Sequence, residues 1–365
     1  MIQGDLFGPR SAPPPINRLE EFCAAVIRQY AGASAVPPSE LAEALRMHFA
    51  IPVPVVLSAQ VRLAQQLGIH DFQFVELPRG CSGYNSQDGD FYTLWVSTLD
   101  HRVRQEHTIF HELYELIHRK LAEQLPTLIP LSSKERERNA DEFAAAVFMP
   151  TESFAKDVLT CGLDVLRLQN LYQRSYSSTL IGIKDSLRRL GIPFVGLLYE
   201  DNDFADIEAV ARRRLGDIEA RIPLQMALHY RWTILGMSAK VNPILASHLP
   251  RSGDMVVPGS LARMVYEHQS AVYIKQATGF DFFGLDDMTV LLRPVIWRGS
   301  TIAKIIILCI RADQGDLLAP QIAGLHCHTV DHIAGLRAPL FEISRQLSLE
   351  LTPPIRSNRA RVAVS

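Results

Sequence analysis

The clearest pattern of apolar and polar positions lies between about residues 100 and 124, where one long helix is expected. At about 100° per residue, segment 107–118 separates into two faces. The apolar face carries Ile109, Phe110, Leu113, Leu116 and Ile117. The opposite face carries His107, His111, Glu115 and His118, with Glu112 at its edge. The pattern predicts a helix with one buried side and one side of metal-binding or proton-binding groups.

Other helices are expected wherever apolar residues recur at helical spacing. They cover 19–30, 41–49, 58–67, 133–149, 164–172 and 178–190, and a charged helix follows from about residue 202. Runs of β-branched and aromatic residues predict strands at 72–77, 91–96, 272–276, 289–295 and 301–310. Residues 80–90 are rich in turn formers and are expected to form a turn. We therefore expect an α+β protein.

Length and composition favour several globular domains. The chain has 365 residues, of which 47% are hydrophobic and 21% charged, which is enough for more than one core. We expect three parts: residues 1–155, residues 156–200, which form a helical region, and residues 201–365.

Charge and cysteine content argue against several protein classes. The formal net charge of −2 gives no global field for nucleic acid or an anionic membrane. The five cysteines contain no CxxC pair, which disfavours a disulfide framework and a cysteine zinc knuckle. Neither a secretion signal nor an apolar run of membrane-spanning length is visible. A cytoplasmic location is expected.

His111 and Glu112 open a variant of the HExxH motif, which here reads His-Glu-Leu-Tyr-Glu. In HExxH enzymes the two histidines, one helical turn apart, bind one zinc ion, and the glutamate activates the metal-bound water. Glu115 takes the place of the second histidine and keeps the required spacing. A solvated polar face is the alternative interpretation for an isolated helix.

The neighbouring segments favour the metal-site interpretation. Residues 80–150 resemble the ImmA/IrrE family of metallopeptidase-like regulators, in which a Gly-rich turn and a strand precede the motif helix and a second helix ends in Met-Pro. The matching residues are Gly80–Gly83, Phe91–Val96, Arg104–His118 and Asn139–Pro150. The resemblance extends to about residue 190 and implies a zincin-like metallopeptidase domain followed by helix-turn-helix-like helices.

That resemblance implies an intracellular regulatory metalloendopeptidase that cleaves or controls a helix-turn-helix transcriptional repressor in a stress or mobile-element response. Glu112 would be the general base, and His111, Glu115 and Asn139 would hold one divalent metal. Zinc is the first expectation for this metal. Manganese or another divalent ion is the alternative, because the ligand set has shifted toward oxygen.

Two departures from the family pattern put hydrolysis in doubt. Glu115 replaces a histidine, and Asn139 stands where the second helix supplies a carboxylate ligand. Three nearby residues are alternative ligands, namely His107, Glu135 and Glu142. The competing hypothesis is a catalytically degenerate pseudo-peptidase that acts as a sensor or as a DNA-binding or protein-binding transcription regulator.

The remaining sequence carries weaker signals. If helices 164–172 and 178–190 read DNA, Lys184, Arg188 and Arg189 are the candidate contacts, although a small packing subdomain is the plainer interpretation. The region from about 250 to 340 suggests an α/β GAF-like sensor domain with an unidentified ligand. His326, Cys327 and His328 together with His332 suggest a second metal site, because His328 and His332 would be one turn apart on a helix, with a non-coordinating cluster as the alternative.

Overall fold

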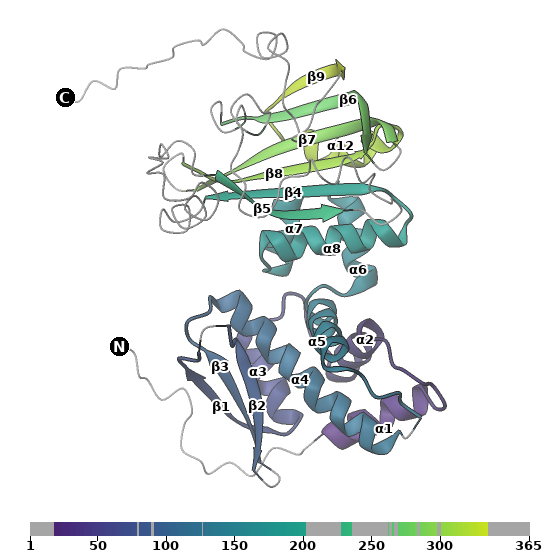
Figure 1. The fold of residues 1–365 in the computed structure, drawn as a ribbon, viewed down its shortest axis with the longest axis vertical. Helices are drawn as coiled ribbons and strands as arrows, with labels where there is room; N and C mark the ends of the chain where they lie inside the picture. The colour runs from purple at the N-terminus through teal and green to yellow at the C-terminus, as the bar shows by residue number, and fades with distance from the viewer. Residues whose placement is uncertain are drawn as a thin grey trace, which may run out of the picture. The chain divides into compact units, whose positions relative to one another are not determined.

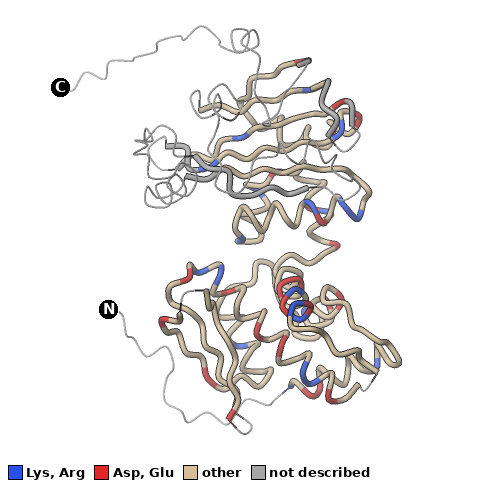
Figure 2. Tube along the Cα trace, in the orientation of Figure 1, with Lys and Arg blue, Asp and Glu red and all other residues tan. Residues whose placement is uncertain are grey.

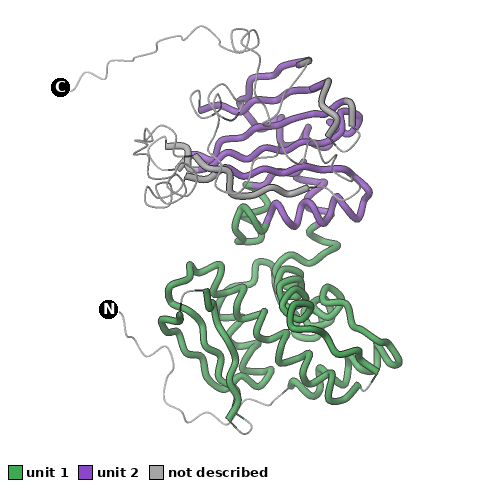
Figure 3. Tube along the Cα trace, viewed as in Figure 1, with its two compact units in different colours: residues 1–154, 166–178 green, residues 155–165, 179–365 purple. Residues whose placement is uncertain are grey.

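The computed structural model describes residues 18–78, 80–88, 91–125, 127–201, 228–235, 262, 265, 269–282, 285–297 and 301–334. Contacts divide the chain into two compact units (Figure 3). Unit 1 comprises Met1–Phe154 and Leu166–Ser178, and unit 2 comprises Ala155–Val165 and Thr179–Ser365. The expected boundaries near residues 156 and 200 stay a prediction. The charged helix expected from residue 202 lies outside the described residues.

Five helices of unit 1 confirm the helical periodicity of the sequence (Figure 1). They are α1 (Leu19–Gln29), α2 (Pro38–Phe49), α3 (Leu57–Gln66), α4 (Arg102–Gln124) and α5 (Ser133–Phe148). Helix α5 begins with a capping box, in which Ser132 and Glu135 satisfy each other's backbone N–H groups. No helix in the described part of the chain is long and apolar enough to cross a lipid bilayer.

Unit 1 also contains a three-stranded sheet with the order β1-β3-β2. Its strands are β1 (Ile69–Val75), β2 (Gly83–Asp88) and β3 (Phe91–Ser97), with β3 parallel to β1 and antiparallel to β2. The expected turn over residues 80–90 is therefore wrong for β2. Its sequence, Gly-Tyr-Asn-Ser-Gln-Asp, has little strand propensity, so pairing with β3 decides its conformation.

Aromatic rings pack helices α4 and α5 together in the core of unit 1. Phe110 meets Phe148 edge-on with ring centroids 5.0 Å apart, and Tyr114 lies 5.5 Å from Phe143. These contacts fix the polar face of α4 relative to α5.

Three further helices follow α5: α6 (Thr151–Thr160), α7 (Val165–Tyr172) and α8 (Tyr176–Arg189). The last two confirm the expected helices, with Gln173 in the left-handed region between them at φ 53°. Helix α6, which begins directly after Pro150, was not expected. Proline is compatible with the start of a helix, where its missing N–H is not needed. Whether α7 and α8 form a functional helix-turn-helix stays a prediction.

Unit 2 is built on a six-stranded sheet with the order β5-β4-β8-β7-β6-β9. Its strands are β4 (Phe194–Asp201), β5 (Leu228–Leu235), β6 (Ala271–Phe282), β7 (Leu285–Trp297), β8 (Thr301–Arg311) and β9 (Cys327–Ala334). The β6–β9 pair is parallel and the other pairs are antiparallel. Strands β4, β5 and β9 were not expected, and β4 places residues 194–201 in this sheet. The GAF-like assignment stays a prediction.

The apolar run Ile305–Ile310 is buried throughout in strand β8, including Cys309, as expected for a strand covered on both faces. A short 3-10 helix (Ala312–Leu318) and α12 (Ala319–Ile322) follow it. The second metal-site hypothesis is wrong in its premise, because His328 and His332 lie on strand β9. Four residues of strand span about 13 Å, which is too far for two ligands of one ion.

Candidate functional site

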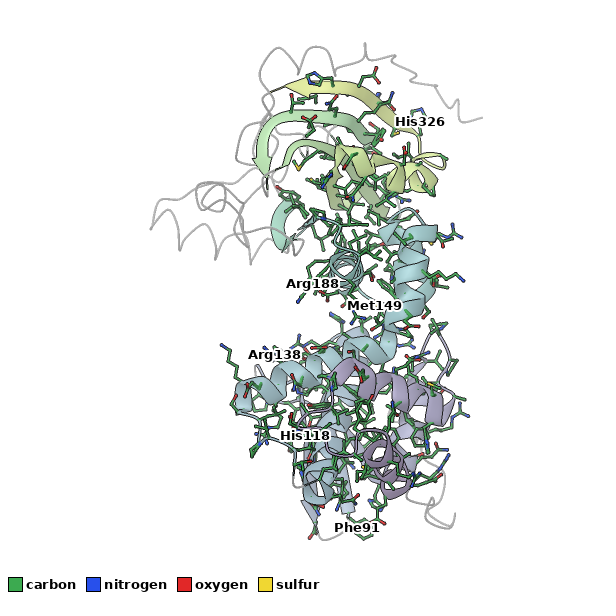
Figure 4. The ribbon with its side chains drawn as sticks, turned by 90° about the vertical axis from the view of Figure 1, so that its right-hand side faces the viewer. Phe91, His118, Arg138, Met149, Arg188 and His326 are labelled. Carbon is green, nitrogen blue, oxygen red and sulfur yellow. The ribbon has the colours of Figure 1, made fainter. Side chains whose placement is uncertain are left out.

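The polar face of α4 lies where the sequence predicts it. The five residues of the apolar face are all fully buried, while His107, His111, Glu115 and His118 are half-buried. Figure 4 labels His118 on α4 and Arg138 on the neighbouring α5. The two-faced helix is therefore confirmed, and the partners of its polar groups determine what the site can do.

Glu112 is the most buried acid of this face, with 8% of its surface exposed. Asn85 of strand β2 donates a hydrogen bond from Nδ2 to its Oε2 at 2.7 Å. Burial raises the pKa of Glu112, and the Asn85 hydrogen bond and the nearby His111 offset part of the rise. The carboxylate is thus held in a fixed orientation in surroundings that favour proton uptake.

A close approach at Gly83 brings β2 near enough for this hydrogen bond. A Cβ atom at Gly83 would lie 2.4 Å from Cγ2 of Thr108 on α4 and 2.6 Å from the carbonyl oxygen of Trp95 on β3. Only glycine fits between these atoms without movement. The Gly-rich segment therefore has a packing role beside the site.

His111 lies between two carboxylates of α5. Its Nδ1 is 3.1 Å from Oδ1 of Asp141, and its Nε2 is 3.2 Å from Oε2 of Glu137. Burial by itself lowers the pKa of His111, but the Asp141 hydrogen bond and the surrounding negative charges raise it overall. The hydrogen bond to His111 lowers the pKa of Asp141 in turn. The arrangement favours a protonated imidazole between two anions.

The other two expected ligands face different partners. Oε2 of Glu115 lies 3.7 Å from Nε of Arg136. Asn139 is hydrogen-bonded to Tyr114, a bond that lowers the pKa of this tyrosine against the larger effect of burial. A guanidinium and a phenol thus occupy the surroundings expected to hold a metal ion.

The alternative ligands Glu135, Glu142 and His107 differ in their surroundings. Glu135 accepts hydrogen bonds from Ser132 in the capping box, and Glu142 is exposed. His107 lies beside His111, with ring centroids 6.4 Å apart. Burial lowers the pKa of His107, so it is favoured as a neutral imidazole.

Comparison with protein families identifies this part of the chain. Residues 64–184 match the family described as Peptidase_M78, IrrE N-terminal-like domain. The chain carries an IrrE N-terminal-like domain. The comparison with curated proteins found no match. A solved structure described as a Mycobacterium tuberculosis transcriptional regulator is 13% identical with a TM-score of 0.48, over 85% of this chain and 86% of that chain, a likeness too low to support a functional argument.

Four residues of the IrrE-like site were not predicted from the sequence: Asn85, Arg119, Glu137 and Asp141. Arg119 donates from NH2 to Oδ1 of Asn85 at 3.1 Å, which orients the amide toward Glu112. A signal for Glu137 and Asp141 existed, because they are four residues apart and share one face of α5. Figure 2 shows that α5 carries many charged residues of both signs. The pair Glu137 and Asp141 therefore does not stand out in the sequence.

In this arrangement the expected ligands His111, Glu115 and Asn139 have other partners, and their binding of a metal ion stays a prediction. Among the described residues, no group of three or more His, Cys, Asp or Glu side chains is placed to hold one. Metal binding requires a neutral imidazole and ligands that converge on one point. Here the two nitrogens of His111 face different carboxylates, Glu115 faces an arginine, and Asn139 faces a tyrosine.

The candidate DNA contacts lie at the C-terminal half of α8. Arg188 and Arg189 are exposed in its last turn, where positive charge complements the helix dipole. Lys184 lies 3.3 Å from Asp185. Recognition helices typically contact bases with N-terminal residues, so DNA binding stays a prediction.

Proposed function

We propose that this protein is a regulator whose IrrE-like domain recognises a partner protein without hydrolysing it. The carrying observation is the contact between Glu115 and Arg136. Arginine does not lose its proton in proteins. Its fixed positive charge beside the second ligand position opposes a divalent cation there.

The surroundings of His111 support the same conclusion. The carboxylates of Glu137 and Asp141 contact its two ring nitrogens. These contacts position the imidazole without a metal ion. The neutral amide of Asn139 contributes no negative charge to offset Arg136. The peptidase fold is thus kept, and the polar groups of its site stabilise one another.

The second candidate is the metalloendopeptidase that the family implies. The observation in its favour is Glu112, which is buried, oriented by Asn85 and has a raised pKa. These are properties expected of a general base. They serve equally to keep the domain rigid, so Glu112 alone does not decide between the two functions.

Under either function we propose a cytoplasmic partner, with a helix-turn-helix repressor as the first candidate. Strand β8 and its neighbours would supply a sensor part, GAF-like in the predicted form, that responds to a small ligand. DNA binding through α8 is the weaker proposal.

Metal analysis of purified full-length protein tests the proposal. After incubation with zinc or manganese and desalting, wild type should retain well under one equivalent. A variant with Glu115→His, Arg136→Gln and Asn139→Glu, which restores the family ligands and removes the guanidinium, should retain about one. The exposed Glu142→Gln is the matched control on α5 and should behave as wild type. One equivalent in wild type that disappears in His111→Ala would overturn the proposal.

Cleavage assays separate the two functions directly. Candidate repressors incubated with wild type and divalent metal should stay intact while they bind. Cutting that Glu112→Gln abolishes would establish the metalloendopeptidase instead.

A further inference from the structure

A groove of about 580 Å³ opens beside the polar face of α4 in unit 1. It is lined by the second half of α4, by Leu125 and Leu128–Leu131, and by Arg136 of α5. Its apolar wall includes Leu128, Ile129, Pro130 and Leu131. Ile129 has 63% of its surface exposed, so a large apolar side chain is available to a partner.

The apolar wall is fixed by hydrogen bonds to a distant part of unit 1. The backbone N–H of Ile129 donates to the carbonyl oxygen of Ser34 at 3.1 Å. The Thr127 hydroxyl donates to the carbonyl oxygen of Ala33 at 3.2 Å. The groove is therefore preformed, which lowers the entropic cost of binding.

The charged side of the groove has one unbalanced cation. Both acids of the lining are paired, Glu115 with Arg136 at 3.7 Å and Glu123 with Lys120 at 3.0 Å. Arg119 also lines the groove, and the described residues give it no carboxylate partner within ion-pair distance. Its charge contributes to lowering the pKa of Glu115 against the larger effect of burial, but the guanidinium makes no ion pair with that acid and can contact an anion in the groove.

Neutral amides hold the Arg119 guanidinium in place. Its NH1 donates to Oε1 of Gln87 at 3.3 Å and its NH2 to Oδ1 of Asn85 at 3.1 Å. Both amides come from strand β2, so the orientation of the cation is set by the sheet. A preoriented guanidinium beside an apolar wall matches a carboxylate attached to an apolar group.

We infer that the groove binds a segment of a partner protein in which a large apolar side chain lies next to an acidic residue. The apolar side chain packs against Ile129 and its neighbours, and the carboxylate accepts hydrogen bonds from Arg119. This inference rests on the proposed function, since it names the chemistry of the partner that the IrrE-like domain recognises.

Peptide selection on the full-length protein tests the inference. A random peptide library displayed on phage is selected on immobilised wild type, and enriched peptides are measured by fluorescence anisotropy. Peptides with Asp or Glu beside Leu, Ile, Phe or Met should be enriched. Changing the acid to its amide should weaken binding about tenfold or more, as expected when a charged hydrogen bond is lost.

Matched variants assign the binding to the groove. Arg119→Gln should weaken the acidic peptide about tenfold and leave its amide counterpart unchanged, and Arg119→Lys should restore part of the loss. Ile129→Ser should weaken both peptides. Lys134→Gln removes an exposed lysine of α5 outside the groove lining and should change neither.

Three results would overturn the inference: no enrichment of acidic and apolar pairs, binding insensitive to both groove variants, or Arg119-dependent binding of decanoate without peptide binding. The last result would identify a site for small apolar acids. The metal analysis and the cleavage assays above report separately on the proposed function. If the wild type retained metal and also bound the peptides in the groove, the inference about the groove would stand. Only the proposal of a non-hydrolytic function would be refuted.

Discussion

Asn85 on strand β2 donates a hydrogen bond of 2.7 Å to the buried carboxylate of Glu112 on helix α4. The same amide accepts a hydrogen bond from Arg119. One side chain thus links the acid of the motif to the guanidinium of the groove. The site and the groove therefore share a support in β2.

Removing the Asn85 amide should reduce the stability of the protein, because the carboxylate of Glu112 is buried. We expect Asn85→Ala to lower the free energy of unfolding by about 1–3 kcal/mol, because a buried carboxylate loses its donor. Urea denaturation measures the change. Gln87→Ala, an exposed position on the same strand that also binds Arg119, is the control and should cost less. Equal effects in both variants would mean that the Asn85–Glu112 bond does not stabilise the fold.

A methyl group at Gly83 should push β2 away from α4. Because its Cβ would overlap Thr108 and the Trp95 carbonyl, Gly83→Ala should destabilise the protein by about 1–3 kcal/mol. Adding Thr108→Ser removes Cγ2 and keeps the hydroxyl bond to the Arg104 carbonyl. The double variant should recover part of the loss in thermal denaturation. No difference between the two variants would contradict the role of Thr108.

A buried ion pair joins Arg174 to Glu106 near the beginning of α4, with 3% and 4% of the two side chains exposed. The Arg174 guanidinium also lies 3.7 Å above the ring of Phe148. Arg174→Met should cost about 3–5 kcal/mol, since the buried carboxylate of Glu106 loses its buried partner and keeps only the exposed Arg102. Adding Glu106→Gln should restore much of this stability, as measured by urea unfolding.

Arg102→Gln is the matched control for this ion pair. Arg102 also binds Glu106, at 2.8 Å, but 70% of its side chain is exposed. Exposed ion pairs contribute little, so this change should cost less than about 1 kcal/mol. A larger effect from Arg102 than from Arg174 would contradict the assignment.

The contact between His111 and Asp141 should make stability depend on pH. The pKa of His111 is raised, so its contribution is present below the unfolded value of about 6.5 and is lost as pH rises through the folded value. The pKa of Asp141 is lowered, so its contribution is present above about 3.9 and is lost as pH falls through the folded value. The pair should therefore stabilise the protein most between these two values.

NMR titration of the His111 ring measures this coupling. Asp141→Asn should lower the pKa of His111, and its effect on stability should be larger at pH 5.5 than at pH 8.5. Glu142→Gln, its exposed neighbour, should leave the titration unchanged. A His111 titration identical in wild type and Asp141→Asn would show that the two groups are not coupled in solution.

The sequence by itself determined the helices of unit 1, the two faces of α4 and the buried strand β8. These features follow from local periodicity, because a helix or strand exposes its residues at a fixed repeat. The residues at fixed offsets from Asn139 to Pro150 likewise indicated an IrrE-like domain. The match of residues 64–184 to the IrrE N-terminal-like domain confirms it. Strand β2 was missed because its residues have little intrinsic preference for a strand, and its structure depends on β3.

Only the tertiary structure decided the partners of the polar groups. His111 was expected to share a metal with Glu115 and Asn139, yet it faces Glu137 and Asp141, while Arg136 faces Glu115. Spacing along α4 shows which residues share a face, but it does not show which side chains of α5 reach them. The rotation of α5 about its axis, set by packing of Phe143 and Phe148 against α4, makes that choice.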